Sequence, residues 1–244
     1  MFKDTSMRFL SANSPRVCEP NFGFAAVGWK VGHKITKGLL YFWIWACFVT
    51  NDPAYSFDIK DLNYLEQFQV CLDCDLTGVN FFGRDLSGYD LRGADLAGAD
   101  LRMSKLIGID LRGAYLADAN LQGADLSGAD FFVADAPRAN FSMANLFDVD
   151  FSSATLFEAN FESAVVIESH FYAADLKGAN FKYTTLENCY FFEANLTDVN
   201  FQSASVVDND FEAAILCRTS FPSGVRNSGC EIELSEKRFP CFSK

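Results

Sequence analysis

Residues 91–130 read LRGADLAGADLRMSKLIGIDLRGAYLADANLQGADLSGAD, a stretch that restarts every five residues. The same register runs from Leu76 to Phe221 without an insertion or a deletion, which gives 30 five-residue units. The central residue of a unit is Leu in 16 cases and Phe in 11, and the residue two positions earlier is Ala in 17. The residue directly before the centre is Asp or Asn in 20 units. Three columns that stay in phase over this length indicate a repeat architecture.

A period of five fits neither an amphipathic helix, which repeats every 3.6 residues, nor a two-sided strand, which repeats every 2. It fits a solenoid in which each unit forms one side of a coil and then turns a corner. The central residue and the small residue two positions before it would then point inward. We therefore predict that residues 75–221 form an all-β solenoid with a closed core.

Over residues 71–221 the sequence resembles the pentapeptide-repeat family, whose pattern is A(D/N)LxX. The resemblance implies a right-handed quadrilateral β-helix with four units per coil, so that the 30 units form about 7.5 coils. All eleven central Phe residues fall on alternate units. Such a coil would place them on two opposite walls, with their rings stacked along the axis. One wall also carries a column of Asn, including residues 120, 140, 160 and 180, from which we expect an amide ladder.

A second outward column consists of Asp90, Asp110, Asp130 and Asp150, four like charges on successive coils. Stacked carboxylates repel one another, so relief is expected from Arg92 and Arg112, from solvent or from a cation.

Gly occupies the second position after the centre in nine of the eleven units up to Gly128 and only once afterwards. Because Gly suits a corner with a positive backbone φ, we expect the corners of the two halves to differ.

The ends of the solenoid need covers, because exposed strand edges invite aggregation. In residues 57–74, Ile59, Leu62, Leu65 and Phe68 follow a helical spacing behind Asp58, a suitable N-cap. We predict a short helix there that caps the first coil. Residues 222–244 contain Pro, Gly, Asn and Ser without a helical period, so an irregular cap or tail is expected.

Residues 1–56 differ from the rest of the chain, with six basic and three acidic residues and a short apolar run over 39–49. The run is shorter than the roughly 20 residues needed to span a bilayer. A basic stretch, a short apolar core and a small-x-small site indicate a secretory signal that is cleaved between Ser56 and Phe57. The alternatives are an uncleaved membrane anchor formed by residues 39–49, an organellar targeting sequence and a cytoplasmic hydrophobic segment.

Two pairs of cysteines flank the repeats. Cys71 and Cys74 form a CxxC that could be a redox or zinc half-site, although no second CxxC accompanies it. An export route permits disulfides, and a bond between Cys217 and Cys230 could join the C-terminal cap to the last coil. The segments CLDCDLTG and LCRTSFPSGVRNSGC also look similar to those bounding exported pentapeptide-repeat proteins of cyanobacteria and the chloroplast lumen. That similarity supports the second pairing.

Composition and charge argue against several classes of function. A net charge of −12 and a pI near 4.5 do not suit a protein that grips nucleic acid by its phosphates. His170 lies in the outward column and has no Ser or Cys partner in phase with it, and the carboxylates follow the repeat. We therefore expect no enzyme activity, no cofactor, no metal and no small-molecule substrate.

The outward position after the centre carries apolar residues where polar ones are expected. They occur on two neighbouring walls, and we interpret them as a docking face for an unidentified protein partner or for a homodimer: Ile107, Phe147, Ile167 and Val207 on one wall, Phe132, Tyr172 and Phe192 on the other.

The leading hypothesis is a non-catalytic interaction or scaffold protein, exported to the periplasm or a thylakoid lumen. The quinolone-resistance relatives imply an alternative, a DNA-mimic inhibitor of the type II topoisomerase gyrase. Acidity fits this alternative, whereas the export signal and the uninterrupted repeats do not. A third hypothesis is a solenoid tethered to, or in transient contact with, a membrane through residues 39–49.

Overall fold

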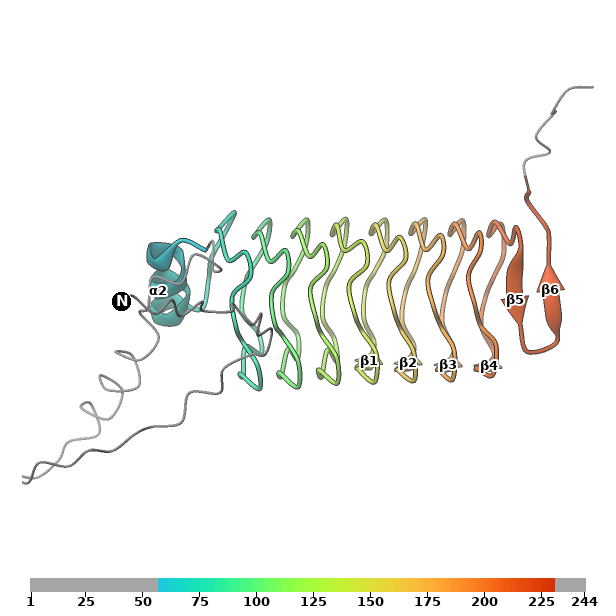
Figure 1. Cartoon of the computed structure of the whole chain (residues 1–244), viewed down its shortest axis with the longest axis horizontal. Coiled ribbons are helices and arrows are strands. Elements are labelled where there is room, and N and C mark those ends of the chain that lie inside the picture. Colours follow the sequence, from blue (N-terminus) through green and yellow to red (C-terminus); the bar gives the residue numbers. More distant parts are fainter. Residues whose placement is uncertain (1–56, 231–244) are drawn as a thin grey trace, which may run out of the picture. The chain divides into compact units, whose positions relative to one another are not determined.

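The structure of the protein is a computed structural model that describes residues 57–230 (Figure 1). The predicted leader, with its apolar run at 39–49 and the Ser56 side of the cleavage site, lies outside the described residues, as do residues 231–244. Within 57–230, no helix combines the length and the apolar character that crossing a bilayer requires.

The predicted N-terminal helix is present as α2, Ile59–Phe68. The Asp58 side chain caps it by accepting a hydrogen bond from the Lys60 N–H at 2.8 Å. Leu65 is buried against the first coil, whereas Ile59 and Phe68 are about half exposed, so the predicted inward stripe is wrong for these two residues. A helix of only ten residues lies across the end of the coil and touches it mainly through one turn.

The body of the structure is a solenoid with a coil of 20 residues. Parallel bridges join each outward residue to the one 20 positions later, from Val70 with Asp90 to Asn200 with Ser220. Four parallel strands form a sheet in the order β1-β2-β3-β4: β1 (Asn145–Phe147), β2 (Val165–Ile167), β3 (Thr185–Glu187) and β4 (Ser205–Val207). An antiparallel pair follows, β5 (Thr219–Phe221) and β6 (Gly224–Arg226).

Each coil therefore contains four five-residue units, one on each of four walls. We number the walls by the central residues that they stack. Wall 1 runs from Leu76 to Leu216, wall 2 from Phe81 to Phe221, wall 3 from Leu86 to Val206 and wall 4 from Leu91 to Phe211, each in steps of 20 residues. The sheet β1–β4 belongs to wall 3, which is adjacent to wall 4.

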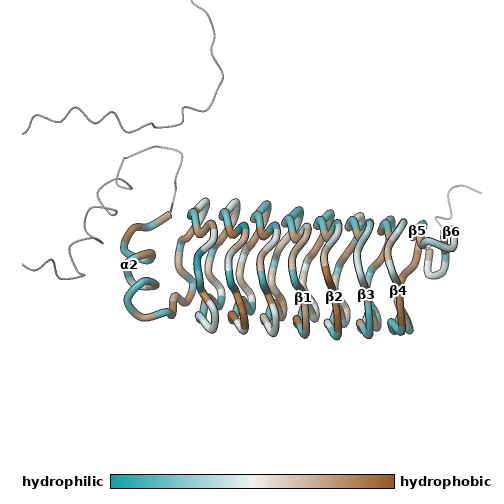
Figure 2. The backbone as a smooth tube through the Cα atoms, turned by 90° about the horizontal axis from the view of Figure 1, so that it is seen from below, coloured by the Kyte–Doolittle hydropathy of each residue, from teal (hydrophilic) through white to brown (hydrophobic). Residues whose placement is uncertain are grey.

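The core confirms the predicted Phe columns. On wall 2, the Phe161 ring stacks on those of Phe141 and Phe181 at centroid distances of 4.9 and 4.5 Å, close to the strand spacing. Across the core, Phe161 meets Phe171 of wall 4 edge to face at 6.2 Å. Hydrophobic and hydrophilic residues alternate around every coil (Figure 2). Two opposite Phe columns thus interlock along the axis and fill the interior.

The corners of the two halves do not differ as expected. The residue in the second position after the centre has a positive φ whether it is Gly128 at 69° or Val133 at 59°. The expectation is wrong for the corner residue because the chain must turn from one wall to the next at every corner, whatever side chain is present. The halves differ instead on wall 3, where the three-residue strands β1–β4 replace isolated bridges from Asn145 onward.

Candidate interaction surface

Wall 2 presents the predicted amide ladder. The Nδ2 atoms of Asn140, Asn160 and Asn180 each donate to the Oδ1 atom of the Asn one coil earlier, at 3.1, 3.2 and 3.0 Å. Each of these accepting Oδ1 atoms also accepts the backbone N–H two residues further on, as in an Asx turn. The polar groups of this column therefore satisfy one another.

Wall 4 begins with the predicted Asp column and its Arg neighbours. Arg92 pairs with Asp90 at 2.7 Å and approaches Asp110 at 3.5 Å, and Arg112 repeats this arrangement with Asp110 and Asp130 at 2.6 and 3.5 Å. Hydrogen bonds from these guanidinium groups hold the pKa values of Asp90 and Asp110 below their usual range. The expected relief by arginine is confirmed for this part of the column.

Further along wall 4 the arginines end. Phe132 and Ser152 occupy the positions that Arg92 and Arg112 hold on earlier coils. Burial raises the pKa of Asp130, with the neighbouring Asp150 carboxylate as a further cause, and the contact with Arg112 does not outweigh them. The C-terminal half of wall 4 therefore keeps carboxylates without an arginine of their own and places apolar side chains beside them.

The structure places all seven residues of the predicted docking face on the outside of two adjacent walls. The exposed fractions of Ile107, Phe132, Phe147, Tyr172 and Val207 lie between 43 and 47%, and Ile167 and Phe192 are partly exposed. The Tyr172 and Phe192 rings stack in parallel at 5.9 Å. We keep the name docking face for this set: Ile107, Phe147, Ile167 and Val207 on wall 3, and Phe132, Tyr172 and Phe192 on wall 4.

Three exposed residues beside this set were not predicted. Val165 on wall 3 and Tyr190 on wall 4 stand in the column directly before the centre, and Val133 lies at a corner of wall 4. The Tyr190 ring stacks on His170 at 5.0 Å. A departure from the Asp/Asn consensus in this column was the signal that could have identified the first two. They widen the docking face in the C-terminal half.

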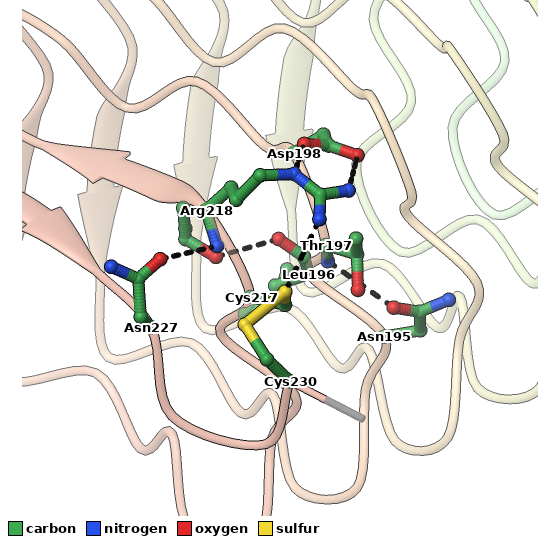
Figure 3. The surroundings of a disulfide bond; sticks show 9 residues. Asn195, Leu196, Thr197, Asp198, Cys217, Arg218, Asn227 and Cys230 are labelled. Atoms are coloured by element: carbon green, nitrogen blue, oxygen red, sulfur yellow. Dashed lines mark hydrogen bonds and ion pairs between the residues drawn. A yellow bond between two sulfur atoms is a disulfide. The ribbon is translucent and has the colours of Figure 1, made fainter. Parts of the chain in front are cut away.

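Both cysteine pairs are disulfides in the structure. Cys71 is bonded to Cys74 and both side chains are buried, so this CxxC presents no free thiolate for a zinc or redox site. Cys217 is bonded to Cys230, which joins wall 1 of the last coil to the segment after β6 (Figure 3). Beside this bond, Arg218 pairs with Asp198 at 2.6 Å and its backbone N–H donates to Asn227 Oδ1 at 3.0 Å.

Metal-ligating side chains and the free cysteine can be examined in the part of the chain that the structure describes. No three His, Cys, Asp or Glu side chains among residues 57–230 lie close enough to hold a metal ion. Cys189, the free cysteine of this range, is buried, and burial raises the pKa of its thiol to about 11, so the thiol remains protonated at neutral pH. What the described surface offers is flat walls with regularly spaced side chains.

The pentapeptide-repeat family model matches this chain in eight copies, over residues 74–113, 94–132, 114–152, 134–162 and 154–191. The matched ranges begin at steps of 20 residues, which is the length of one coil in the structure. The chain belongs to the pentapeptide-repeat family. Proteins of this family fold as right-handed quadrilateral β-helices and are generally structural or interaction proteins.

Several solved pentapeptide-repeat structures are similar to the chain. HetL, which is involved in heterocyst differentiation regulation in the cyanobacterium Nostoc sp. strain PCC 7120, is 21% identical over 70% of this chain and 100% of its own, with a TM-score of 0.31. The plasmid-mediated fluoroquinolone resistance protein QnrB1 is 16% identical over 62% of this chain and 80% of its own, with a TM-score of 0.41. A thylakoid lumen protein of Arabidopsis thaliana is 34% identical over 42% of this chain and 68% of its own, with a TM-score of 0.22. No curated protein matches the chain.

Proposed function

We propose that this pentapeptide-repeat protein is a non-catalytic scaffold whose docking face binds a partner protein. In this proposal about 7.5 coils form the body and α2 caps the first of them. The proposal rests on the exposed apolar side chains of walls 3 and 4, which stand at positions where the repeat otherwise places polar residues.

Single exposed apolar residues are common on proteins and need no explanation. The docking face differs because its members recur at steps of 20 or 40 residues on two walls that share a corner. Aromatic residues such as Phe132, Phe147 and Tyr172 are the types that contribute most to protein interfaces. Wall 2, by contrast, presents a ladder of Asn side chains whose amide groups hydrogen-bond to one another. Association through walls 3 and 4 would remove the apolar surface of the docking face from water.

A photo-crosslinking pull-down from the producing cells tests the docking face. We expect the double variant Phe147→Ser/Tyr172→Ser to lose at least about 90% of the crosslinked partner, as loss of interface anchors requires. The matched control is Phe82→Ser/Tyr183→Ser, which removes two aromatics from wall 2 that are more exposed than Phe147 and Tyr172. Equal capture by the two variants would contradict the proposal. A crosslink to a second copy of the chain would identify a homodimer as the complex.

Export to the periplasm or a thylakoid lumen is part of the proposal. The leader pattern before Phe57 supports it, and two disulfides in the structure suit an oxidising compartment. Sequencing the N-terminus of the mature protein tests it. We expect the mature chain to begin at Phe57, and an intact leader on the purified cytosolic protein would contradict export.

Gyrase inhibition by DNA mimicry is the second candidate, and the observation that favours it is charge. Residues 57–244 contain 14 basic and 29 acidic residues, a net charge of −15. Arg92 and Arg112 neutralise part of the Asp column, which weakens a mimic of the DNA phosphates. A supercoiling assay with purified gyrase separates the candidates, because a scaffold without this activity leaves supercoiling unchanged at micromolar concentration.

A further inference from the structure

The two apolar columns of the docking face are separated by a strip of acidic side chains. Along one coil the chain passes Ile167 on wall 3, Glu168 at the corner and Tyr172 on wall 4, all on the outside. Two other coils of the C-terminal half place carboxylates at the corner and at the first outward position of wall 4. We call this set the acidic strip: Asp148, Asp150, Glu168, Asp208 and Asp210. A partner that covers both apolar columns must therefore cover the strip as well.

The carboxylates of the acidic strip lack a cation of their own in the part of the chain that the structure describes. None of the five forms an ion pair there. Asp150 and Asp210 each accept the backbone N–H two residues further on, at 2.8 Å. Among the described residues from 125 to 213, walls 3 and 4 carry ten acidic residues and no Lys or Arg. The Lys and Arg residues of that range lie on walls 1 and 2: Arg138, Lys177 and Lys182.

The opposite corner of the solenoid shows that the repeat can supply such cations. The second position after the centre forms the corner column between walls 1 and 2, where acidic residues and arginines are interspersed. Arg138 pairs with Asp118 at 2.6 Å, and Arg218 pairs with Asp198 at 2.6 Å, in both cases across one coil. The same position between walls 3 and 4 provides three members of the acidic strip and no arginine. The docking face is therefore where acidic charge is left without a neighbouring cation.

We propose that the partner of the docking face presents a cationic amphipathic protein segment, in which Lys or Arg side chains stand between apolar ones. The inference rests on the proposed docking function and adds the chemistry of the partner. An apolar partner surface laid over both columns would take the carboxylates of the acidic strip out of water without a counter-charge, which is unfavourable. Cations of the partner offset that cost while its apolar side chains cover Phe147 and Tyr172.

The same charge argues against a second copy of the chain on this face. In a dimer with twofold symmetry the same surface patch meets itself, so the acidic strip of one copy would lie against that of the other. Like charges that face each other across an interface oppose association. An anionic lipid surface meets the same objection. The face is therefore suited to a protein segment of opposite charge.

Fluorescence anisotropy on the full chain with three labelled peptides tests the proposal. All three peptides carry the same Leu and Phe residues, combined with Lys in the first, Gln in the second and Glu in the third. We expect the Lys peptide to bind at least about 10-fold more tightly than the Gln peptide, and the Glu peptide to bind more weakly than either. Equal or tighter binding of the Gln peptide would overturn the proposal.

Two variants that each remove two negative charges separate the acidic strip from the net charge of the chain. Asp148→Asn/Glu168→Gln alters the strip and is expected to weaken binding of the Lys peptide at least about 5-fold. Asp118→Asn/Glu158→Gln makes the same exchanges at the opposite corner and is expected to keep the affinity within about 2-fold. All four side chains are exposed, so both variants are expected to fold. Equal affinities of the two variants would refute a role of the strip.

A third variant separates this proposal from the docking function on which it rests. Phe147→Ser/Tyr172→Ser is expected to weaken binding of the Lys peptide at least about 10-fold. If the Gln peptide binds best and this variant abolishes its binding, the docking function stands and the cationic partner is refuted. If the Lys peptide binds this variant as tightly as the unsubstituted chain, the docking function is wrong and the proposal falls with it. A dimer of the chain that dissociates in this variant would show that a second copy occupies the face, and would also overturn the proposal.

Discussion

The substitution of Asp by Asn at two successive coils of wall 4 is expected to change stability in opposite directions. Asp110 accepts two hydrogen bonds from the Arg112 guanidinium, at 2.9 and 2.6 Å, and one from the Arg112 backbone N–H at 3.2 Å. Asp130 accepts the Phe132 N–H at 2.9 Å and meets Arg112 only at 3.5 Å. The two carboxylates thus occupy the same position of the repeat but differ in their neutralising partner.

The expected magnitudes follow from exposure and from hydrogen bonding. The Arg112 side chain is 44% exposed, so solvent weakens its ion pair and Asp110→Asn is expected to cost about 0.5–1 kcal/mol. Asp130→Asn removes a charge that burial disfavours while it retains the oxygen that accepts the Phe132 N–H. The new amide can also donate to Asp110, as Asn145 does to Asp125 at 3.0 Å. We expect a gain of about 0.5–1 kcal/mol.

The dependence on pH follows from the direction of each pKa shift. The lowered pKa of Asp110 means that its ionised form stabilises the fold above the usual Asp pKa near 3.9, and that this contribution is lost as pH falls through the lower folded value. The raised pKa of Asp130 means the reverse: ionised Asp130 destabilises the fold at neutral pH, and this cost disappears as pH falls from its folded value to about 3.9. The advantage of Asp130→Asn should therefore shrink near pH 4, while Asp110→Asn remains destabilising there.

Urea unfolding of both variants and the unsubstituted chain, at pH 7 and pH 4, measures these differences. Local exchange of the amides in wall 4 provides a second readout, because solenoids do not always unfold in one step. If both substitutions shift the midpoint in the same direction at pH 7, the assignment of neutralised and unneutralised carboxylates is wrong.

Three further predictions concern the core, a corner and the C-terminal disulfide. Phe161→Ala should lower the free energy of unfolding by about 3–5 kcal/mol, because the ring is buried between two stacked rings. Phe132→Ala removes an exposed ring and should change the free energy of unfolding by less than about 0.5 kcal/mol. Similar urea midpoints for the two variants would contradict the stacked core. Val133→Gly should raise the free energy of unfolding by about 1 kcal/mol in the same assay, because a β-branched residue is strained at a φ of 59°. A loss of stability would contradict this and show that the Val133 side chain contributes packing. The double variant Cys217→Ser/Cys230→Ser should lower the free energy of unfolding by about 2–3 kcal/mol, since the disulfide bond closes a 13-residue separation. A thermal transition unchanged relative to the oxidised chain would show that this disulfide does not stabilise the fold.

Much of the candidate site was predictable from the sequence because the repeat assigns every residue a direction. Once the period is five and the coil is 20 residues, an apolar residue directly after the centre, such as Phe147 or Tyr172, must point outward. The exposure of Tyr190 follows from the same rule, because the position directly before the centre also points outward. The path of α2 was less predictable, because a helical spacing does not specify how much of a short helix contacts the coil beneath it.

The sequence by itself determined the architecture of this protein. Its register of five over 30 units specifies the inward columns and the alternation of Phe, and these lead directly to stacked rings on opposite walls. Local periodicity is sufficient here because every coil contacts only its neighbours, so one short pattern repeated in phase defines the whole core.

Tertiary structure alone decided the properties that depend on contacts between coils or at the ends. Asp110 and Asp130 occupy the same position of the repeat, but hydrogen bonds from Arg112 lower the pKa of Asp110, whereas burial, with the Asp150 carboxylate as a further cause, raises the pKa of Asp130. The burial of the last central residues depends in the same way on where the β5–β6 hairpin turns back: Phe221 is buried, whereas Val206 is only partly buried. In both cases the reason is that the contacts depend on how neighbouring coils and the chain end lie relative to one another, which the five-residue pattern does not specify.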